Sequence, residues 1–434
     1  METQQNRCYG MVAGLSKDNC NDTTVRTYTS IMFSGDLVYV TAFKLTQHMR
    51  KTIFFQPLQL FLVASLLLLL PLLIAGCHGR ISGKLPDMAV KPVDSLATGE
   101  TKALLLNLKK LSFDHFLFGQ EDALAYGVGW RADTFRTDVH DISGAFPALF
   151  GWDISFLGRP YNIDSVDFGR MRKWMQMVYD KGGVNTVSMH MPNPVTGTNA
   201  WDTTRAVYAI LPGGSRHDFF KAELDKVAAF FLGLKGSDGK PIPVIFRPWH
   251  EHTGSWFWWG EKSCTKEEYK ALWHFTVSYL RDVKGVHNLL YAYSPDRFVT
   301  ADKYLERFPG LNYIDILGFD DYGDFQQLNT AAAGVKQIRT VVELADSLVK
   351  VPALTETGLL GLKDSVWFTK SFLGPLEKDP VASRIAYMLV WRNVDGPRAC
   401  APFKGSSSIN DFMNFRDDER SWFLEDLHKM YQQP

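Results

Sequence analysis

The sequence predicts a (β/α)8 barrel, and two observations lead to that fold class. From about residue 100 onward, short apolar runs alternate with longer segments of helical pattern. This alternation is typical of a parallel sheet that helices bury on both faces. There are eight apolar runs, the number of strands in such a barrel. The strands are expected at 116–120, 147–153, 184–190, 243–251, 289–296, 313–322, 352–358 and 386–393.

The second observation is that a polar or aromatic residue lies at the end of each of these runs or within two residues of it. In a barrel the carboxyl ends of the strands converge on one mouth, where active sites lie. A doubly wound sheet is the alternative. Caps and turns could explain one polar residue at the end of a strand but do not easily explain eight, so the barrel is favoured. The closing residues are Gln120, Asp153, His190, Glu251, Asp296, Tyr322, Glu356 and Trp391.

Helical patterns separate the predicted strands. Two clear examples are residues 221–234 and 265–283. The second begins with Thr265 followed three residues later by Glu268, the spacing of a capping box. One catalytic domain is therefore expected over residues 99–434.

An apolar segment precedes the predicted barrel. Residues 61–76 (FLVASLLLLLPLLIAG) follow the basic stretch Met49-Arg50-Lys51, so residues 49–76 are predicted to be a secretion signal. The signal ends in Leu73-Ile74-Ala75-Gly76-Cys77, which resembles a bacterial lipobox and implies lipid attachment at Cys77. Residues 77–98 contain Pro and Gly without a core pattern, and we expect them to form a flexible tether.

These features predict an exported bacterial lipoprotein that contacts the outer membrane only through its lipid. No acidic residue follows Cys77 directly, which favours the periplasmic face over the cell surface. Residues 1–48 form an unusual leader because a secretion signal normally stands first, so we expect translation to begin at Met49. An uncleaved membrane helix is the alternative. The residues that argue against it are Gln56, Pro57, Gln59 and Pro71.

Composition narrows the possible partners. Lys plus Arg and Asp plus Glu both number 47, so no net charge directs the chain to nucleic acid. Aromatic residues reach 13%, and Trp beside acidic and imidazole groups at strand ends suits sugars, whose C–H faces stack on rings. A monomer is expected. Cys264 and Cys400 have no spacing that decides whether they pair.

Two glutamates at predicted strand ends indicate a reaction. Glu251 closes the fourth run and Glu356 the seventh, and an unpaired carboxylate is costly in such a place. One such Glu is explained equally well by a salt bridge, to Arg247 or Arg392. A pair facing each other across the mouth fits glycoside hydrolysis, in which one carboxyl protonates the leaving oxygen and the other attacks the anomeric carbon.

The stretch RPWHEHTGSWFWWG (247–260) resembles the acid/base motif of glycoside hydrolase family 26, which consists chiefly of endo-β-1,4-mannanases. ALTETG (353–358) resembles the nucleophile strand of the same family, and the similarity extends over roughly residues 100–430. The resemblance implies a barrel enzyme that acts on β-mannan by retention without cofactor or metal. Glu251 would be the acid/base and Glu356 the nucleophile.

The resemblance also implies substrate-binding roles for residues around the mouth. His250 and His190 would contact hydroxyls, Tyr322 would hydrogen-bond Glu356, and Trp391 would lie under the reacting ring. Trp256 would line the leaving-group side. The chain departs from the family at His252-Thr253, where Met-Asn is common. The full set expected to bind substrate is His190, His250, Trp256, Asp320, Tyr322 and Trp391.

Other functions stay open at this point. A related retaining glycanase acting on xylan or mixed-linkage glucan is the runner-up, and mannobiose release from chain ends is a variant of the main hypothesis. A non-catalytic glycan-binding lipoprotein is a third hypothesis, although both glutamates are present. His250-Glu251-His252 also resembles a metal-ligand cluster, but it lacks the H-E-x-x-H spacing of zinc proteases.

Overall fold

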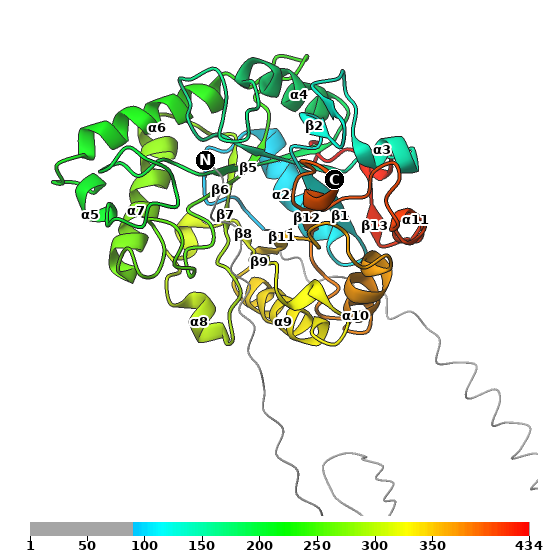
Figure 1. Ribbon diagram of the computed structural model, residues 1–434. Coiled ribbons are helices and arrows are strands. Elements are labelled where there is room, and N and C mark those ends of the chain that lie inside the picture. Colours follow the sequence, from blue (N-terminus) through cyan, green and yellow to red (C-terminus); the bar gives the residue numbers. More distant parts are fainter. Residues whose placement is uncertain (1–89, 434) are drawn as a thin grey trace, which may run out of the picture. The chain divides into compact units, whose positions relative to one another are not determined.

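A computed structural model describes residues 90–433, and the predicted barrel is present (Figure 1). All eight expected strands form, and each pairs in parallel with its neighbours. The strand positions around the ring are β1 (Phe116–Glu121), β4 (Leu149–Asp153), β5 (Val184–Met189), β6 (Val244–Pro248), β7 (Leu289–Tyr293), β8 with β9 (Ile316–Leu317, Asp320–Asp321), β10 with β11 (Val351–Pro352, Leu354–Thr357) and β12 (Tyr387–Val390).

The sixth and seventh strands close the ring, although each is divided into two short pieces. β8 pairs with both β7 and β10, while β9 pairs with β11, which in turn pairs with β12. Backbone hydrogen bonds continue across the break, from Gly318 N to Tyr293 O (2.8 Å) and from Thr355 N to Phe319 O (3.0 Å). The sheet is therefore a closed barrel rather than an open doubly wound sheet.

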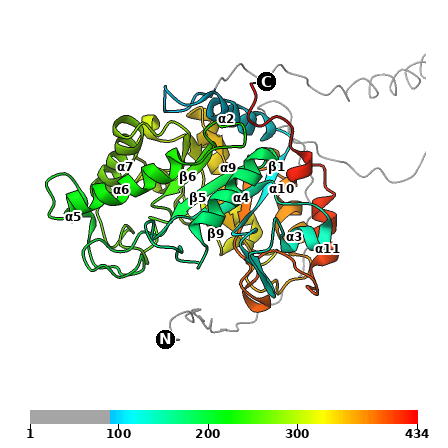
Figure 2. The same ribbon diagram turned by 90° about the horizontal axis from the view of Figure 1, so that it is seen from above.

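Helices surround the ring in Figure 1, and Figure 2 shows the same helices after a turn of 90°. The predicted capping box is confirmed: Glu268 N donates to Thr265 Oγ1 (3.1 Å) and Thr265 N donates to the Glu268 carboxylate (2.8 Å). A π-helical turn, Tyr279–Val283, extends that helix to the predicted end. The helices are α2 (Gly99–Leu111), α3 (Asp138–Ser143), α4 (Phe168–Asp180), α5 (Val207–Ile210), α6 (His217–Leu232), α7 (Lys266–Ser278), α8 (Ala301–Leu305), α9 (Ala331–Ser347), α10 (Gly374–Glu377) and α11 (Ile409–Arg416).

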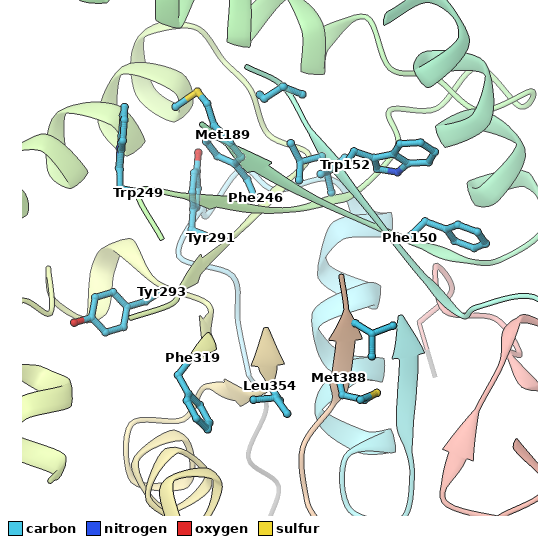
Figure 3. Packing of buried hydrophobic residues seen from close by; sticks show 14 of the residues in the cluster. Phe150, Trp152, Met189, Phe246, Trp249, Tyr291, Tyr293, Phe319, Leu354 and Met388 are labelled. Atoms are coloured by element: carbon cyan, nitrogen blue, oxygen red, sulfur yellow. The ribbon is translucent and has the colours of Figure 1, made fainter. Parts of the chain in front are cut away.

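Strand alternation explains the continuous apolar runs, because successive side chains point to opposite faces. On β6, Ile245 belongs to a buried cluster formed with residues of the neighbouring strands. Val244 and Phe246 belong to a second buried cluster that includes residues of the surrounding helices. Large rings fill that outer layer, including Trp152, Phe246 and Tyr291 (Figure 3). Both faces of each strand are thus buried, which requires apolar residues at nearly every position.

Short elements outside the ring shape its rim. β2 (Tyr126–Gly127) and β3 (Trp130–Arg131) form an antiparallel hairpin after β1. β13 (Ser421–Trp422) adds a parallel strand to β1. Among the described residues, no helix is long and apolar enough to span a bilayer.

The N-terminal predictions fall mostly outside the described residues. The leader, the signal, Cys77 and most of the tether lie there. The end of the expected tether, residues 90–98, packs on the barrel: Val93 N donates to Asp315 (2.7 Å) and Asp94 contacts His287 (2.7 Å). Cys264 and Cys400 are buried free thiols that do not pair with each other.

Candidate active site

Glu251 lies in a turn beyond β6, not at the strand end as the sequence predicted. β6 ends at Pro248, and the backbone then enters the left-handed region, with φ of 54° at Trp249 and 50° at Glu251. Such a backbone is costly for large side chains and persists only where neighbours hold it. Three hydrogen bonds hold this turn, from Tyr269 Oη to Trp249 O (3.0 Å), from Trp259 Nε1 to His250 O (2.8 Å) and from Glu251 N to Ser294 O (2.7 Å).

The turn brings Glu251 to the carboxylate of Glu356, on β11. One carboxylate oxygen from each of Glu251, Glu356 and Asp320 lies within 4.8 Å of the others. Glu356 retains only 3% exposure, while Glu251 is partly exposed. Two carboxyl groups from opposite parts of the chain therefore share the barrel mouth.

Glu356 is held by two donors. The guanidinium of Arg247, on β6, forms a buried ion pair with Glu356 Oε1 and contacts Asp320 at 2.9 Å. The Tyr322 hydroxyl donates to Glu356 Oε2 at 2.9 Å, as the sequence analysis expected. The salt bridge considered above for a lone glutamate is thus present, with Arg247 as its partner. Both carboxylate oxygens of Glu356 are fixed in orientation.

Glu251 occupies a different electrostatic environment. Burial, followed by the negative charges of Asp320 and Glu356, raises the pKa of Glu251 well above its ordinary value. Trp256 Nε1 donates to Glu251 Oε2 at 2.7 Å, and the Trp256 ring is 37% exposed beside it. Two neighbouring carboxyls are thereby distinguished: Glu251 favours its protonated form, and Glu356 is paired with a cation.

Asp320 differs from the expectation that it contacts substrate. Its side chain is fully buried. One of its oxygens accepts hydrogen bonds from Ser294 Oγ (2.7 Å) and Thr355 Oγ1 (2.8 Å), and the other faces Arg247. Burial raises the pKa of Asp320 to about 7, against the lowering effect of Arg247. In this structure Asp320 orients Arg247 from within the barrel.

The two expected histidines lie together at the mouth. His190 and His250 have ring centroids 4.6 Å apart, and the Trp391 ring lies 6.4 Å from His190. His190 Nδ1 contacts the Asp153 carboxylate at 2.8 Å, so its partner is an acid rather than backbone. Burial alone would lower the pKa of His190, but the charge of Asp153 raises it overall. Burial and the charge of Arg247 lower the pKa of His250 well below its ordinary value.

Two residues near the site were not selected from the sequence. Glu121, which ends β1, is 2% exposed, and its carboxyl lies where a Cβ on Gly151 would approach within 1.9 Å. Burial and then the charge of Asp122 raise the pKa of Glu121, with Glu356 contributing. Trp201 is half exposed and stacks on His190 at 5.2 Å. In the sequence, Glu121 could have been found as one of the two acidic residues that follow Gln120, and Trp201 as a single Trp in a polar loop.

The alternative of a metal bound by His250-Glu251-His252 is not supported by side-chain placement. His252 lies away from the carboxylates, between the rings of Tyr269 (4.2 Å) and Tyr293 (4.8 Å). Within residues 90–433, the three acidic groups that approach one another are Glu251, Asp320 and Glu356, and the guanidinium of Arg247 already contacts two of them. The single positive charge of Arg247 therefore balances part of the charge of these carboxylates.

Replacing His252 with Phe is expected to make the protein more resistant to acid. The His252 ring is fully buried, and burial lowers its pKa well below 6.5. Below pH 6.5 the unfolded chain binds a proton at this residue that the native protein does not. The free energy of unfolding therefore falls as the pH decreases, by up to about 1.4 kcal/mol per pH unit. Denaturant unfolding at pH 7 and pH 5 should show that the free energy of unfolding falls less between these pH values for His252→Phe than for wild type. An equal loss in the two proteins would contradict this prediction.

Comparison with known proteins identifies the family of this chain. The sequence model described as "Glycosyl hydrolase family 26" matches residues 93–367, more than half of the chain. The chain belongs to glycoside hydrolase family 26. The match includes both glutamates and ends before β12, which the structural similarities below also cover.

Several relatives in this family are named as mannanases. A mannan endo-1,4-β-mannosidase of Bifidobacterium adolescentis is 37% identical over 354 residues, covering 76% of this chain and 35% of that protein. One from Bacillus subtilis (strain 168) is 30% identical over 252 residues, covering 54% of this chain and 66% of its own length. The chain thus spans about a third of the first relative and about two thirds of the second.

Solved structures of the family superpose on the barrel. A family 26 β-mannanase from Bacteroides ovatus is 40% identical with a TM-score of 0.73, covering 77% of this chain and 98% of that one. The catalytic domain of an endo-β-1,4-mannanase from Bacillus sp. JAMB-750 is 35% identical with a TM-score of 0.75, covering 79% and 96%. The barrel fold is therefore shared with these proteins.

Proposed function

We propose that this protein is a retaining endo-β-1,4-mannanase. The observation that carries the proposal is the approach of the Glu251 and Glu356 carboxylates, whose nearest oxygens are within 4.8 Å. Retaining enzymes hold their two carboxyl groups about 5–5.5 Å apart, whereas inverting enzymes need about 6.5–9.5 Å to admit a water. The close approach of one oxygen from each carboxyl resembles the retaining arrangement more than the inverting one, and it supports direct attack by a carboxylate.

In the first step, a Glu356 oxygen attacks the anomeric carbon while Glu251 transfers its proton to the departing glycosidic oxygen. The glycosidic bond breaks, and a covalent glycosyl ester forms on Glu356. In the second step, Glu251 takes a proton from water, whose oxygen attacks the same carbon and releases Glu356. Double displacement restores the starting configuration and both protonation states.

The environments of the two residues suit these roles. The raised pKa of Glu251 keeps a proton available for the first step at a higher pH than an ordinary glutamate would. When Glu356 becomes an ester it loses its negative charge, so one cause of the raised pKa disappears and Glu251 can act as a base. Arg247 and Tyr322 hold the Glu356 carboxylate in its orientation before the reaction.

Substrate contacts follow from the groups that surround the two carboxyls. His250 and His190 offer ring nitrogens toward hydroxyls of the reacting sugar, and the Trp391 ring offers an apolar surface beneath it. Trp256, which donates a hydrogen bond to Glu251, lines the leaving-group side. The names of the relatives direct the choice of sugar to β-1,4-linked mannose.

The test is a time course of products from linear mannan and from mannohexaose. Early appearance of oligosaccharides of mixed length supports endo action, while mannobiose as the sole early product would indicate release from chain ends. Xylan and mixed-linkage glucan serve as comparison substrates. Preference for either of these, or binding of mannan without hydrolysis, would overturn the proposal.

Replacing Tyr322 with Phe is expected to lower kcat by about 10- to 100-fold while the fold is kept. The variant removes one donor to the Glu356 carboxylate, and a hydrogen bond to a charged group contributes about 1.5–3 kcal/mol. Tyr304→Phe provides a control of the same type, since the Tyr304 hydroxyl donates to the backbone oxygen of Gly318 and not to a carboxylate.

We also propose that the protein is exported and lipidated at Cys77. The support is the apolar signal and the lipobox-like sequence before that residue, which lie outside the described part of the chain. Labelling with a radioactive or alkynyl fatty acid in a bacterial host should mark the wild-type protein and not a Cys77→Ser variant. Equal labelling of both would contradict lipidation at this residue.

A further inference from the structure

The turn that carries Glu251 has a backbone that its own residues do not favour. Trp249 and Glu251 both lie in the left-handed region, with φ of 54° and 50°, which side chains of this size rarely adopt. Such a conformation persists only where the surrounding structure holds it. A change of backbone at either residue would move the Glu251 carboxyl, which must lie within hydrogen-bond reach of the atom that it protonates. The groups that hold the turn therefore decide how well the acid is placed.

Tyr269, in α7, is one of these groups. The capping box of Thr265 and Glu268 begins α7, and Tyr269 is the next residue after the box. The Tyr269 side chain is fully buried, and its Oη donates to Trp249 O at 3.0 Å. This hydrogen bond connects the first left-handed residue of the turn to a helix 20 positions further along the chain. The start of the turn is thus held by an element outside the turn itself.

Arg307, which precedes β8, holds both the Tyr269 ring and the far end of the same loop. Its side chain is buried, and its guanidinium lies 4.7 Å from the centroid of the Tyr269 ring. Arg307 Nη2 donates to Trp259 O at 3.3 Å and contacts Cys264 Sγ at 2.9 Å. The loop that follows β6 is therefore held by Tyr269 at its first residue and by Arg307 near its last, and these two side chains contact each other.

Two tyrosines contact the residue next to Glu251, but their hydroxyls have different partners. The ring of His252 lies 4.2 Å from that of Tyr269 and 4.8 Å from that of Tyr293. Both tyrosines are fully buried. The Tyr269 hydroxyl donates to the turn, whereas the Tyr293 hydroxyl donates to Tyr304 O at 2.8 Å. The two residues therefore allow the hydrogen bond to the turn to be separated from the packing around His252.

We propose that Tyr269, held in place by Arg307, is a positioning residue for proton transfer by Glu251. The inference rests on the proposed mannanase function and on Glu251 being the acid/base. Tyr269 is fully buried and acts through the turn: its hydroxyl fixes the Trp249 carbonyl, and the turn directs Glu251 toward Glu356. Without the hydroxyl the backbone can relax, and the acid is less often in place. Only the steps that need its proton are then slowed.

The test compares Tyr269→Phe with wild type on mannohexaose and on dinitrophenyl β-mannobioside. The variant loses the hydroxyl and keeps the ring. The ratio of kcat/KM on mannohexaose to kcat/KM on the aryl mannobioside should fall roughly five- to tenfold, because a sugar leaving group needs the proton and dinitrophenolate does not. Both values come from one preparation, so the ratio does not depend on the fraction of folded protein. A loss of stability alone would leave it unchanged.

Tyr293→Phe is the matched control. It also removes one buried hydroxyl that donates to a backbone oxygen, and its ring also contacts His252. Its ratio should equal that of wild type. An equal fall in both variants would assign the effect to packing around His252 and would overturn the role of the bond to Trp249.

A second readout places Tyr269→Phe in the Glu251→Ala background. Because Tyr269 acts through Glu251, the added substitution should change kcat/KM on mannohexaose by less than about twofold. A further loss as large as that in the wild-type background would show that Tyr269 acts independently of the acid, and would overturn the proposal.

An unchanged ratio in Tyr269→Phe, with wild type active on mannan, would likewise overturn the positioning role and leave the proposed function intact. Inactive wild type on every mannan would instead overturn the proposed function.

Discussion

Replacing Glu356 with Ala is expected to abolish mannan hydrolysis, with kcat reduced by roughly 10⁴-fold or more, as when nucleophiles of other hydrolases are removed. The variant has no oxygen to attack the anomeric carbon, and the loss cannot be recovered by raising the substrate concentration. It also leaves the buried Arg247 with Asp320 as its remaining carboxylate partner. Reducing-sugar release and a thermal melt, measured on the same preparation, separate lost chemistry from lost structure.

Glu356→Gln is the matched variant, because the amide keeps the volume of the carboxyl and leaves an oxygen for one of the two donors. It should bind mannohexaose and hydrolyse none of it. A small anion offers a further check on the role of Glu356: in Glu356→Ala, azide can enter the vacated space and attack from the same face. An activated aryl β-mannoside should then yield the α-mannosyl azide. Hydrolysis of polymer by either variant at close to the wild-type rate would refute the assignment.

Replacing Glu251 with Ala has the second largest expected effect, and the effect depends on the leaving group. Mannan hydrolysis should fall by about 10²–10⁴-fold because the sugar leaving group needs a proton. In aryl β-mannobiosides with acidic phenols, the phenolate leaves without that proton. The first step of their hydrolysis should therefore be largely spared, and the glycosyl ester should accumulate. Added azide should then release it as the β-mannosyl azide, the opposite configuration to that expected from Glu356→Ala.

The pH dependence gives an independent readout for Glu251. Wild-type activity should fall as the pH rises through its elevated pKa, and Glu251→Ala should lose this basic limb on activated substrates. The stability of the native protein should also depend on the protonation of Glu251. Above pH 4.5 the unfolded chain ionises this residue while the native protein keeps the proton, so native stability is lost as the pH rises. Glu251→Gln should therefore melt at a higher temperature than wild type at neutral pH, with the difference disappearing near pH 4.

Much of the fold and the approach of Glu251 to Glu356 could be predicted from local sequence features. Each apolar run had the length of one strand, and the capping box at Thr265 marked the start of a helix. The two glutamate motifs were short and specific enough to be found without contacts. These features could be predicted because strand burial and helix capping act between residues close in the chain.

The sequence alone therefore determined the eight strands, the barrel and the two glutamates. Tertiary structure decided how those glutamates differ: Arg247 reaches Glu356 across 109 positions and Asp320 across 73. It also placed Glu251 in a left-handed turn beyond β6 and turned Asp320 inward. Neither result can be predicted from local sequence patterns. Charge pairing and backbone strain depend on which side chains come together when the barrel closes. The pKa values in turn depend on those neighbours.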